Sequence, residues 1–185
     1  MNLLYLPRSG AHPCYTQGNF PSSNARMNTT EQLFAALREG DAATVSRLVK
    51  DDATLLASRD PRGSTPLLLA TYLQQESVVE ALVDAGADVN ARDAAGNTPL
   101  MGLCFKGYLP LAEYLLAHGA DVNVANFTGA TALIFAATFN RPAMVDLLLQ
   151  AGADVSHRDN RGLTAADHAR TNGQGELADR LSIPG

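Results

Sequence analysis

The chain has 185 residues, of which 46% are hydrophobic and 18% are charged, and its formal net charge at pH 7 is −5. This composition supports a single packed domain, and no apolar run approaches the roughly 18 to 20 residues that span a bilayer. The acidic balance argues against a surface that neutralises phosphate backbones. We therefore expect neither a membrane nor a nucleic-acid partner.

Residues 1–28 form an extension whose composition differs from that of the rest of the chain. The part from 1 to 26 contains three prolines and no acidic residue, which predicts a segment that does not fold alone. Met27 stands directly before Asn28, a plausible helix start, so two interpretations stay open: a segment that is not native, or a genuine tail on the protein's own surface. The apolar stretch Leu3 to Leu6 is too short for the core of a signal peptide, so we expect a cytoplasmic protein.

The next segment, residues 29–59, carries the pattern of two helices joined by a short break. Gly40 and Asp41 occupy that break. Its outward positions are polar, as a terminal unit of a stacked array requires. Apolar residues at helical spacing predict both helices: Leu33, Ala36 and Leu37 in the first, and Val45, Leu48 and Val49 in the second.

A single fixed period governs the chain from residue 60 onward. The string GADVN occupies residues 86–90 and 119–123 and returns as GADVS at 152–156, with equal intervals between the copies. Two independent motifs that repeat in step indicate a solenoid, in which each unit buries its apolar face only against its neighbours. The same period relates four glycines, Gly63, Gly96, Gly129 and Gly162, and four threonines, Thr65, Thr98, Thr131 and Thr164.

Each period predicts two helices followed by a hairpin. Thr-Pro pairs at 65–66 and 98–99 combine a capping hydroxyl with a proline at the first helical position, where the missing N–H costs nothing. A second helix follows a short break at Gln74 or Gly107, and a glycine such as Gly86 ends it in left-handed backbone. The remaining residues are turn-forming. We expect four hairpins at about residues 58–64, 91–97, 124–130 and 157–163, which separate five helix pairs.

The strings TPLLLA at 65–70, TPLMGL at 98–103 and GADVN resemble the ankyrin repeat, whose signature begins TPLHLA and whose length matches the period of this chain. The resemblance implies an all-α fold, an ankyrin-repeat solenoid of stacked antiparallel helix pairs joined by short β-hairpin loops. It divides residues 29–182 into an N-terminal capping repeat at 29–59, full repeats at 60–92, 93–125 and 126–158, and a C-terminal capping repeat at 159–182.

One position departs from the family pattern in every unit. Where the ankyrin signature has histidine after Thr-Pro-Leu, this chain has Leu68, Met101, Ile134 and Asp167. We therefore expect the usual contact between the threonine and histidine side chains to be absent throughout. The apolar replacements predict denser packing, with Leu68, Met101 and Ile134 largely buried.

Several strings imitate catalytic sites but lack the partners that such chemistry needs. His157-Arg158-Asp159 copies the first letters of a protein-kinase catalytic loop, yet no Gly-rich phosphate loop or metal-binding motif accompanies it. Asp159 also shares the repeat register of Asp60 and Asp93, where turn chemistry explains an aspartate. We predict no enzymatic activity and no cofactor.

The remaining histidines and cysteines predict no metal site. His12 and Cys14 lack further ligands at zinc spacing, and His118 and His168 have no partner that the sequence identifies. Two cysteines far apart are no disulfide framework. We expect Cys104 to be an ordinary buried residue.

The resemblance places the binding surface on the concave face, which the hairpins and the inner surfaces of the first helices form. Aromatic residues recur there, which predicts a row of interface hot spots across adjacent repeats; the alternative is that these rings pack as core. By register, the first helices end with Tyr72, Leu73, Phe105, Lys106, Thr138 and Phe139, and the hairpin tips carry Arg62, Ala95 and Phe127.

Hairpin arginines form a second set of candidates, since they are suited to binding the carboxylates of a partner. The set comprises Arg62, Arg92, Arg158 and Arg161. Aspartates beside them offer local partners instead, and surface charge is usually only solvated.

Together these features favour a non-catalytic protein–protein interaction module that binds another protein or a peptide segment. We expect a monomer whose partner is an extended or helical segment with apolar anchors and acidic flanks. The alternative is a small regulatory or chaperone-like accessory subunit dedicated to one enzyme, and the sequence does not separate the two.

Overall fold

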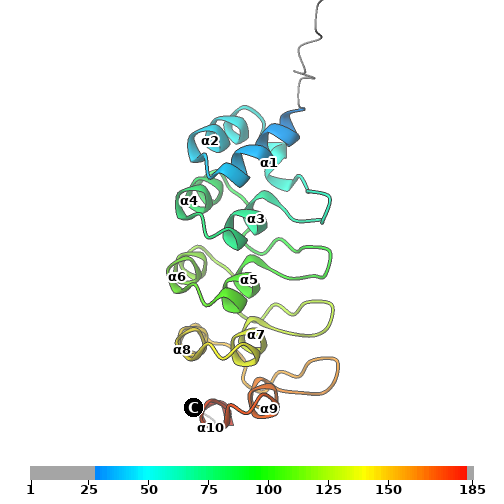
Figure 1. Cartoon of the computed structure of the whole chain (residues 1–185), viewed down its shortest axis with the longest axis vertical. Coiled ribbons are helices and arrows are strands. Elements are labelled where there is room, and N and C mark those ends of the chain that lie inside the picture. Colours follow the sequence, from blue (N-terminus) through cyan, green and yellow to red (C-terminus); the bar gives the residue numbers. More distant parts are fainter. Residues whose placement is uncertain (1–27, 183–185) are drawn as a thin grey trace, which may run out of the picture.

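The computed structural model describes residues 28–182, in which five helix pairs stack in a single column (Figure 1). The N-terminal extension, with its apolar stretch, His12, Cys14 and Met27, lies outside the described residues. None of the helices in the described part has the length and apolar character needed to cross a membrane. The pairs are α1 (Thr29–Glu39) with α2 (Ala42–Asp51), α3 (Pro66–Tyr72) with α4 (Glu76–Asp84), α5 (Pro99–Lys106) with α6 (Leu109–Ala117), α7 (Ala132–Thr138) with α8 (Pro142–Gln150), and α9 (Ala165–Thr171) with α10 (Gly175–Ser182); a short 3-10 helix, η1 (Ala53–Ala57), follows α2.

The first helices of the four units from residue 60 onward are capped by their threonines, as the sequence indicated, whereas Asn28 caps α1. The Thr65 side chain accepts a hydrogen bond from the Leu68 N–H at 3.3 Å, and Thr98, Thr131 and Thr164 cap their helices in the same way. In the last repeat the threonine also donates its hydroxyl hydrogen to the Asp167 carboxylate at 2.9 Å. The threonine–histidine contact of the family cannot form, since no repeat has the histidine, but in the last repeat aspartate offers an acceptor that bonds the threonine instead.

Left-handed backbone separates the two helices of every pair. Gly40, Gly107 and Gly173 have φ values between 73° and 78°, as glycine allows without steric cost. Gln74 and Asn140 occupy the equivalent positions with φ of 58° and 51°. These two residues form the same turn, but left-handed backbone is less favourable for a residue that has a Cβ.

The hydrophobic core runs continuously along the stack, between the two columns of helices. Leu82, Leu115 and Leu148, at the same register of successive second helices, are fully buried. The predicted burial of Leu68, Met101 and Ile134 is confirmed. Cys104 is also buried, and burial raises the pKa of its thiol.

The loops between repeats lie where hairpins were expected, but in residues 28–182 they contain no β-strand. Each is a tight turn held by a side chain: Asp60 Oδ1 accepts the N–H groups of Arg62 and Ser64 at 2.9 and 2.8 Å. Neighbouring loops are joined by isolated backbone bonds, such as Phe127 N–H to the Ala95 carbonyl, which are too few for a ladder. The same turn recurs at Asp93, Asn126 and Asp159.

Hydrogen bonds between repeats explain the GADVN string. The Asn90 side chain donates to the Gly119 carbonyl at 3.1 Å and accepts the Asp121 N–H at 2.8 Å. Asn123 makes the same pair of bonds to Gly152 and Asp154 one repeat later. The last copy ends in serine, because no GADVN segment follows for an asparagine to bind.

Candidate protein-interaction surface

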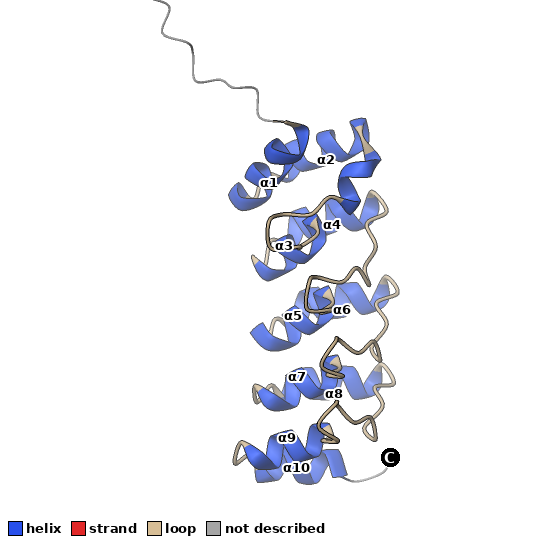
Figure 2. Cartoon of the chain, turned by 90° about the vertical axis from the view of Figure 1, so that its right-hand side faces the viewer, coloured by secondary structure: helices blue, strands red, loops and turns tan. Residues whose placement is uncertain are grey.

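The loops and the first helices form one continuous face, here called the concave face, which comprises the loops 58–64, 91–97, 124–130 and 157–163 with α3, α5, α7 and α9. Figure 2 views the molecule from the side of these loops, which follow one another down the stack. Two open pockets lie between the loops and the helices. The upper pocket, about 400 Å³, lies against α3 and α5, and the lower pocket, about 530 Å³, lies against α7 and α9.

The predicted aromatic row is exposed on this face. Tyr72 is 51% exposed, and Phe105 and Phe139 are 39% and 40% exposed. Phe105 and Phe139 meet edge to face with their centroids 4.6 Å apart. Lys106 Nζ lies 4.3 Å from the centroid of the Tyr72 ring, a cation–π contact that holds the ring in place. Tyr72, Lys106, Phe105 and Phe139 therefore form a linked row along three repeats.

Phe127 lies apart from this row, on a loop, and is the most exposed of the aromatic candidates at 65%. Its ring packs against Gly96 of the preceding loop, where an added Cβ would lie only 2.8 Å from a ring carbon. Glycine at position 96 is thus required both by its φ of 82° and by this close approach. Phe127 lines the lower pocket together with Phe135 and Phe139.

A further set of equivalent positions, not identified from the sequence, lines both pockets. Leu69, Gly102, Phe135 and His168 occupy the same position in successive repeats, and all four line a pocket. Phe135 lines both pockets and so stands between them. Gly102 removes a side chain from the upper pocket, and no atom lies within 4 Å of the position its Cβ would take. The repeat period alone shows that these four positions are equivalent, so they could have been found from the sequence.

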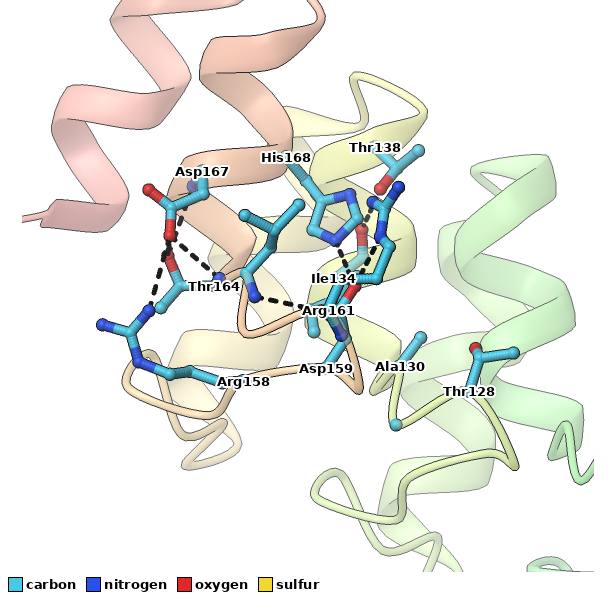
Figure 3. A network of polar contacts seen from close by, with 12 residues as sticks. Thr128, Ala130, Ile134, Thr138, Arg158, Asp159, Arg161, Thr164, Asp167 and His168 are labelled. Carbon is cyan, nitrogen blue, oxygen red and sulfur yellow. Dashed lines mark hydrogen bonds and ion pairs between the residues drawn. The ribbon is translucent and has the colours of Figure 1, made fainter.

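Polar side chains form one wall of the lower pocket (Figure 3). His168 Nε2 lies 2.8 Å from Asp159 Oδ2, and Arg161 Nε lies 3.5 Å from the same oxygen. Burial raises the pKa of Asp159, but hydrogen bonds from the Leu163 N–H, from His168 and from the Arg161 N–H outweigh it and lower the pKa to about 2. Asp159 is therefore ionised at neutral pH, and its carboxylate accepts hydrogen bonds from its own loop and from His168.

The hairpin arginines differ in how they are held. The Arg158 guanidinium donates to the Gly162 carbonyl at 2.7 Å and lies 3.8 Å from Asp167, so it braces its own loop. Arg62 and Arg92 are exposed, and no hydrogen bond or ion pair of their guanidinium groups occurs within residues 28–182. Arg161 is exposed at the lower pocket and shares Asp159 with His168.

Comparison with known proteins agrees with this architecture. A family model described as ankyrin repeats (3 copies) matches residues 19–93 and 91–159. The chain belongs to the ankyrin-repeat family. It is also similar to the serine/threonine-protein kinase VIK of Arabidopsis thaliana, with 39% identity over 67 residues. This match covers 36% of the chain and 15% of the kinase. It is therefore no basis for assigning kinase activity to this protein.

The three residues that imitate the start of a kinase catalytic loop form hydrogen bonds within the repeats. His157 Nε2 lies 2.8 Å from the Gly129 carbonyl oxygen, and Arg158 and Asp159 bond within their own loop and to α9. His118 packs on Tyr114 and lies 2.7 Å from its carbonyl oxygen. Among residues 28–182, no three His, Cys, Asp or Glu side chains are grouped as metal ligands would be.

Ankyrin repeats are generally protein–protein interaction modules. In this chain the exposed aromatic row, the loop tips and both pockets lie on one face. The face offers apolar area, fixed aromatic rings and exposed cationic groups.

Proposed function

We propose that this ankyrin-repeat protein is a non-catalytic module that binds a partner protein on its concave face, with residues 29–182 acting as one domain of five repeats. The observation that carries the proposal is the linked row of Tyr72, Lys106, Phe105 and Phe139. Exposed aromatic residues on a rigid surface are typical of binding hot spots. Since packing already holds these rings, they lose little conformational entropy when a partner covers them.

The other residues of the proposed site surround this row. Leu73 extends it at the end of α3, and Phe127 extends it at a loop tip. Arg62 lines the upper pocket together with Tyr72, and Arg92 supplies exposed positive charge on the next loop. We assign Arg158 to the scaffold of its loop, because its guanidinium is already bound there.

Site-specific photo-cross-linking tests the proposal. A benzophenone amino acid placed at Tyr72 or Phe127 should cross-link to a partner in a lysate of the source organism. The same amino acid at Glu113, exposed on α6, is the matched control and should not. Cross-linking from Glu113 alone would contradict the concave-face proposal. A single stoichiometric enzyme among the products would favour the accessory-subunit alternative, and varied proteins would favour a general adaptor.

A further inference from the structure

We infer that the partner segment is an extended, acidic peptide with two apolar anchors, one for each pocket of the concave face. This inference rests on the proposed function and goes beyond it by specifying the chemistry of the partner. It follows from the charge distribution, from the shapes of the two pockets and from their spacing.

Charge is distributed unequally between the two sides of the stack. The second helices α2, α4, α6, α8 and α10 form the column away from the loops (Figure 1). They carry eight acidic residues, Asp51, Glu76, Glu80, Asp84, Glu113, Asp146, Glu176 and Asp179, and three basic residues, Arg47, Lys50 and Arg180. The concave face carries seven basic residues, Arg59, Arg62, Arg92, Lys106, Arg158, Arg161 and Arg170, and four acidic residues, Asp60, Asp93, Asp159 and Asp167. A protein with a net charge of −5 thus presents a basic binding face.

The acidic side chains of the concave face are committed to the scaffold. Asp60, Asp93 and Asp159 each accept two backbone N–H groups of their own loop, and Asp167 accepts bonds from Thr164 and Arg170. The cationic groups at the pockets are less engaged. The Arg62 guanidinium at the upper pocket has no hydrogen bond or ion pair within residues 28–182, Lys106 Nζ beside this pocket lies over the Tyr72 and Phe105 rings, and Arg161 shares a single carboxylate. The carboxylates of this face keep their charge, but the concave face as a whole carries seven basic and four acidic side chains, so negative charge on the partner is favoured on this face.

Each pocket combines this charge with an apolar floor. In the upper pocket the floor is formed by Leu69, Met101 and Phe135 around the space left by Gly102. In the lower pocket it is formed by Ile134 and Phe135, with Phe127 and Phe139 as walls and Arg161 at the polar side. An apolar side chain flanked by carboxylates is complementary to both.

The spacing of the pockets determines the spacing of the anchors. The first helices pack in sequence, α3 on α5, α5 on α7 and α7 on α9, and packed helices lie about 8 to 10 Å apart. The upper pocket lies against α3 and α5 and the lower against α7 and α9, so their centres are about 16 to 20 Å apart. An extended chain advances about 3.3 Å per residue. Two anchors should therefore be about five or six residues apart.

Selection from a displayed library of random peptides of about 12 residues tests the inference, since that length spans about 40 Å when extended. The chain of residues 1–185 serves as bait. We expect enriched peptides to be acidic, with two apolar side chains about five or six residues apart. Enrichment of neutral or basic peptides, or of none, would overturn the inference.

Two variants show whether an enriched peptide uses the concave face. Gly102→Leu fills the upper pocket without entering the core, and Lys106→Glu reverses a charge beside it. Each should weaken binding at least about tenfold, or 1.4 kcal/mol. Lys50→Glu makes the same charge change on α2, away from the concave face, and should stay within about twofold of the unmodified chain. Circular dichroism confirms that each variant is folded.

The possible results separate this inference from the proposed function. Peptides that are not acidic but lose binding to Gly102→Leu would overturn the acidic partner and leave the concave-face function intact. Acidic peptides that bind Gly102→Leu unchanged would contradict both. A dimer in sedimentation analysis that Gly102→Leu dissociates would assign the pockets to a second copy of the chain and overturn the inference.

Discussion

The rings of Phe105 and Phe139 meet edge to face, with an interplanar angle of 88° and centroids 4.6 Å apart. The two residues come from successive repeats, so the contact joins neighbouring units at the exposed rim of the stack. Each ring nevertheless keeps about two fifths of its surface exposed. The pair therefore contributes both to the packing between repeats and to the proposed binding surface.

This dual role predicts different stability effects within the aromatic row. Phe105→Ala should lower the free energy of unfolding by about 1 to 2 kcal/mol, because it removes an aromatic pair and some buried area. Tyr72→Ala should cost less than about 1 kcal/mol, since Tyr72 is half exposed and its ring makes an exposed cation–π contact with Lys106. Urea unfolding of both variants provides the measurement. Equal losses would mean that the edge-to-face contact contributes nothing measurable.

In the core, Leu115→Ala should be far more costly. Leu115 is fully buried between Leu82 and Leu148 in register, and truncation of a buried leucine costs about 2 to 5 kcal/mol through lost burial and the cavity that remains. This loss is large against a total stability on the order of 10 kcal/mol. A loss under about 1 kcal/mol in denaturant unfolding would be inconsistent with a core role. Leu116→Ala, at a partly buried neighbour, is the matched control and should cost less.

The sequence predicted the stack and its core well, because both depend on local spacing. The Thr-Pro pairs, the glycines at helix ends and the leucines of the second helices recur with one period, and each copy has the same environment. Positions such as Leu115 could therefore be assigned to the core directly. The register of Leu69, Gly102, Phe135 and His168 could have been read by the same rule.

Contacts that differ between repeats could not be predicted in this way. The link between Asp159 and His168 exists only where a loop aspartate faces a histidine one helix later, and no other repeat has that combination. The position of Lys106 over Tyr72 depends on side-chain rotamers in two repeats. The loops close as the expected hairpins, with a backbone bond such as Asp60 N–H to the Ser64 carbonyl, but the side-chain bonds of Asp60 that also hold the turn were not predicted.

Backbone strain at Gln74 offers a stabilising substitution. Gln74 has a φ of 58°, whereas glycine occupies the equivalent position in three other units. Gln74→Gly should raise the free energy of unfolding by about 0.5 to 1 kcal/mol, as left-handed backbone costs a side chain about that much or more. Thermal and urea unfolding would both detect it.

The reverse substitution provides the control for Gln74→Gly. In Gly107→Ala the new Cβ would lie 2.9 Å from the Arg141 side chain, at a φ of 78°. This variant should be destabilised. If both variants were destabilised, the left-handed conformation would not be the limiting factor at position 74.

The pKa of Asp159 predicts a loss of stability in acid. Its pKa is about 2 in the folded protein against 3.8 for an unperturbed aspartate, so the unfolded state binds the proton more tightly. The contribution of Asp159 is therefore complete above the unfolded value and is lost as the pH falls from 3.8 toward about 2.

Asp159→Asn should reduce this acid sensitivity. Asn126 makes the same two loop bonds one repeat earlier, so asparagine is compatible with the turn. Urea unfolding at about pH 5 and about pH 3 should show a smaller difference for the variant than for the unmodified chain. An unchanged difference would mean that other carboxylates determine the acid sensitivity.

Hydrogen–deuterium exchange of the full chain, with and without a bound partner, tests the central claim most directly. Binding on the concave face should slow exchange in the loops around residues 58–64, 91–97 and 124–130 and in α3, α5 and α7, because these segments line the proposed site. Exchange in α4, α6 and α8 should change little. Protection confined to α4, α6 and α8, with the loops unaffected, would place the partner on the opposite side of the stack and contradict the account.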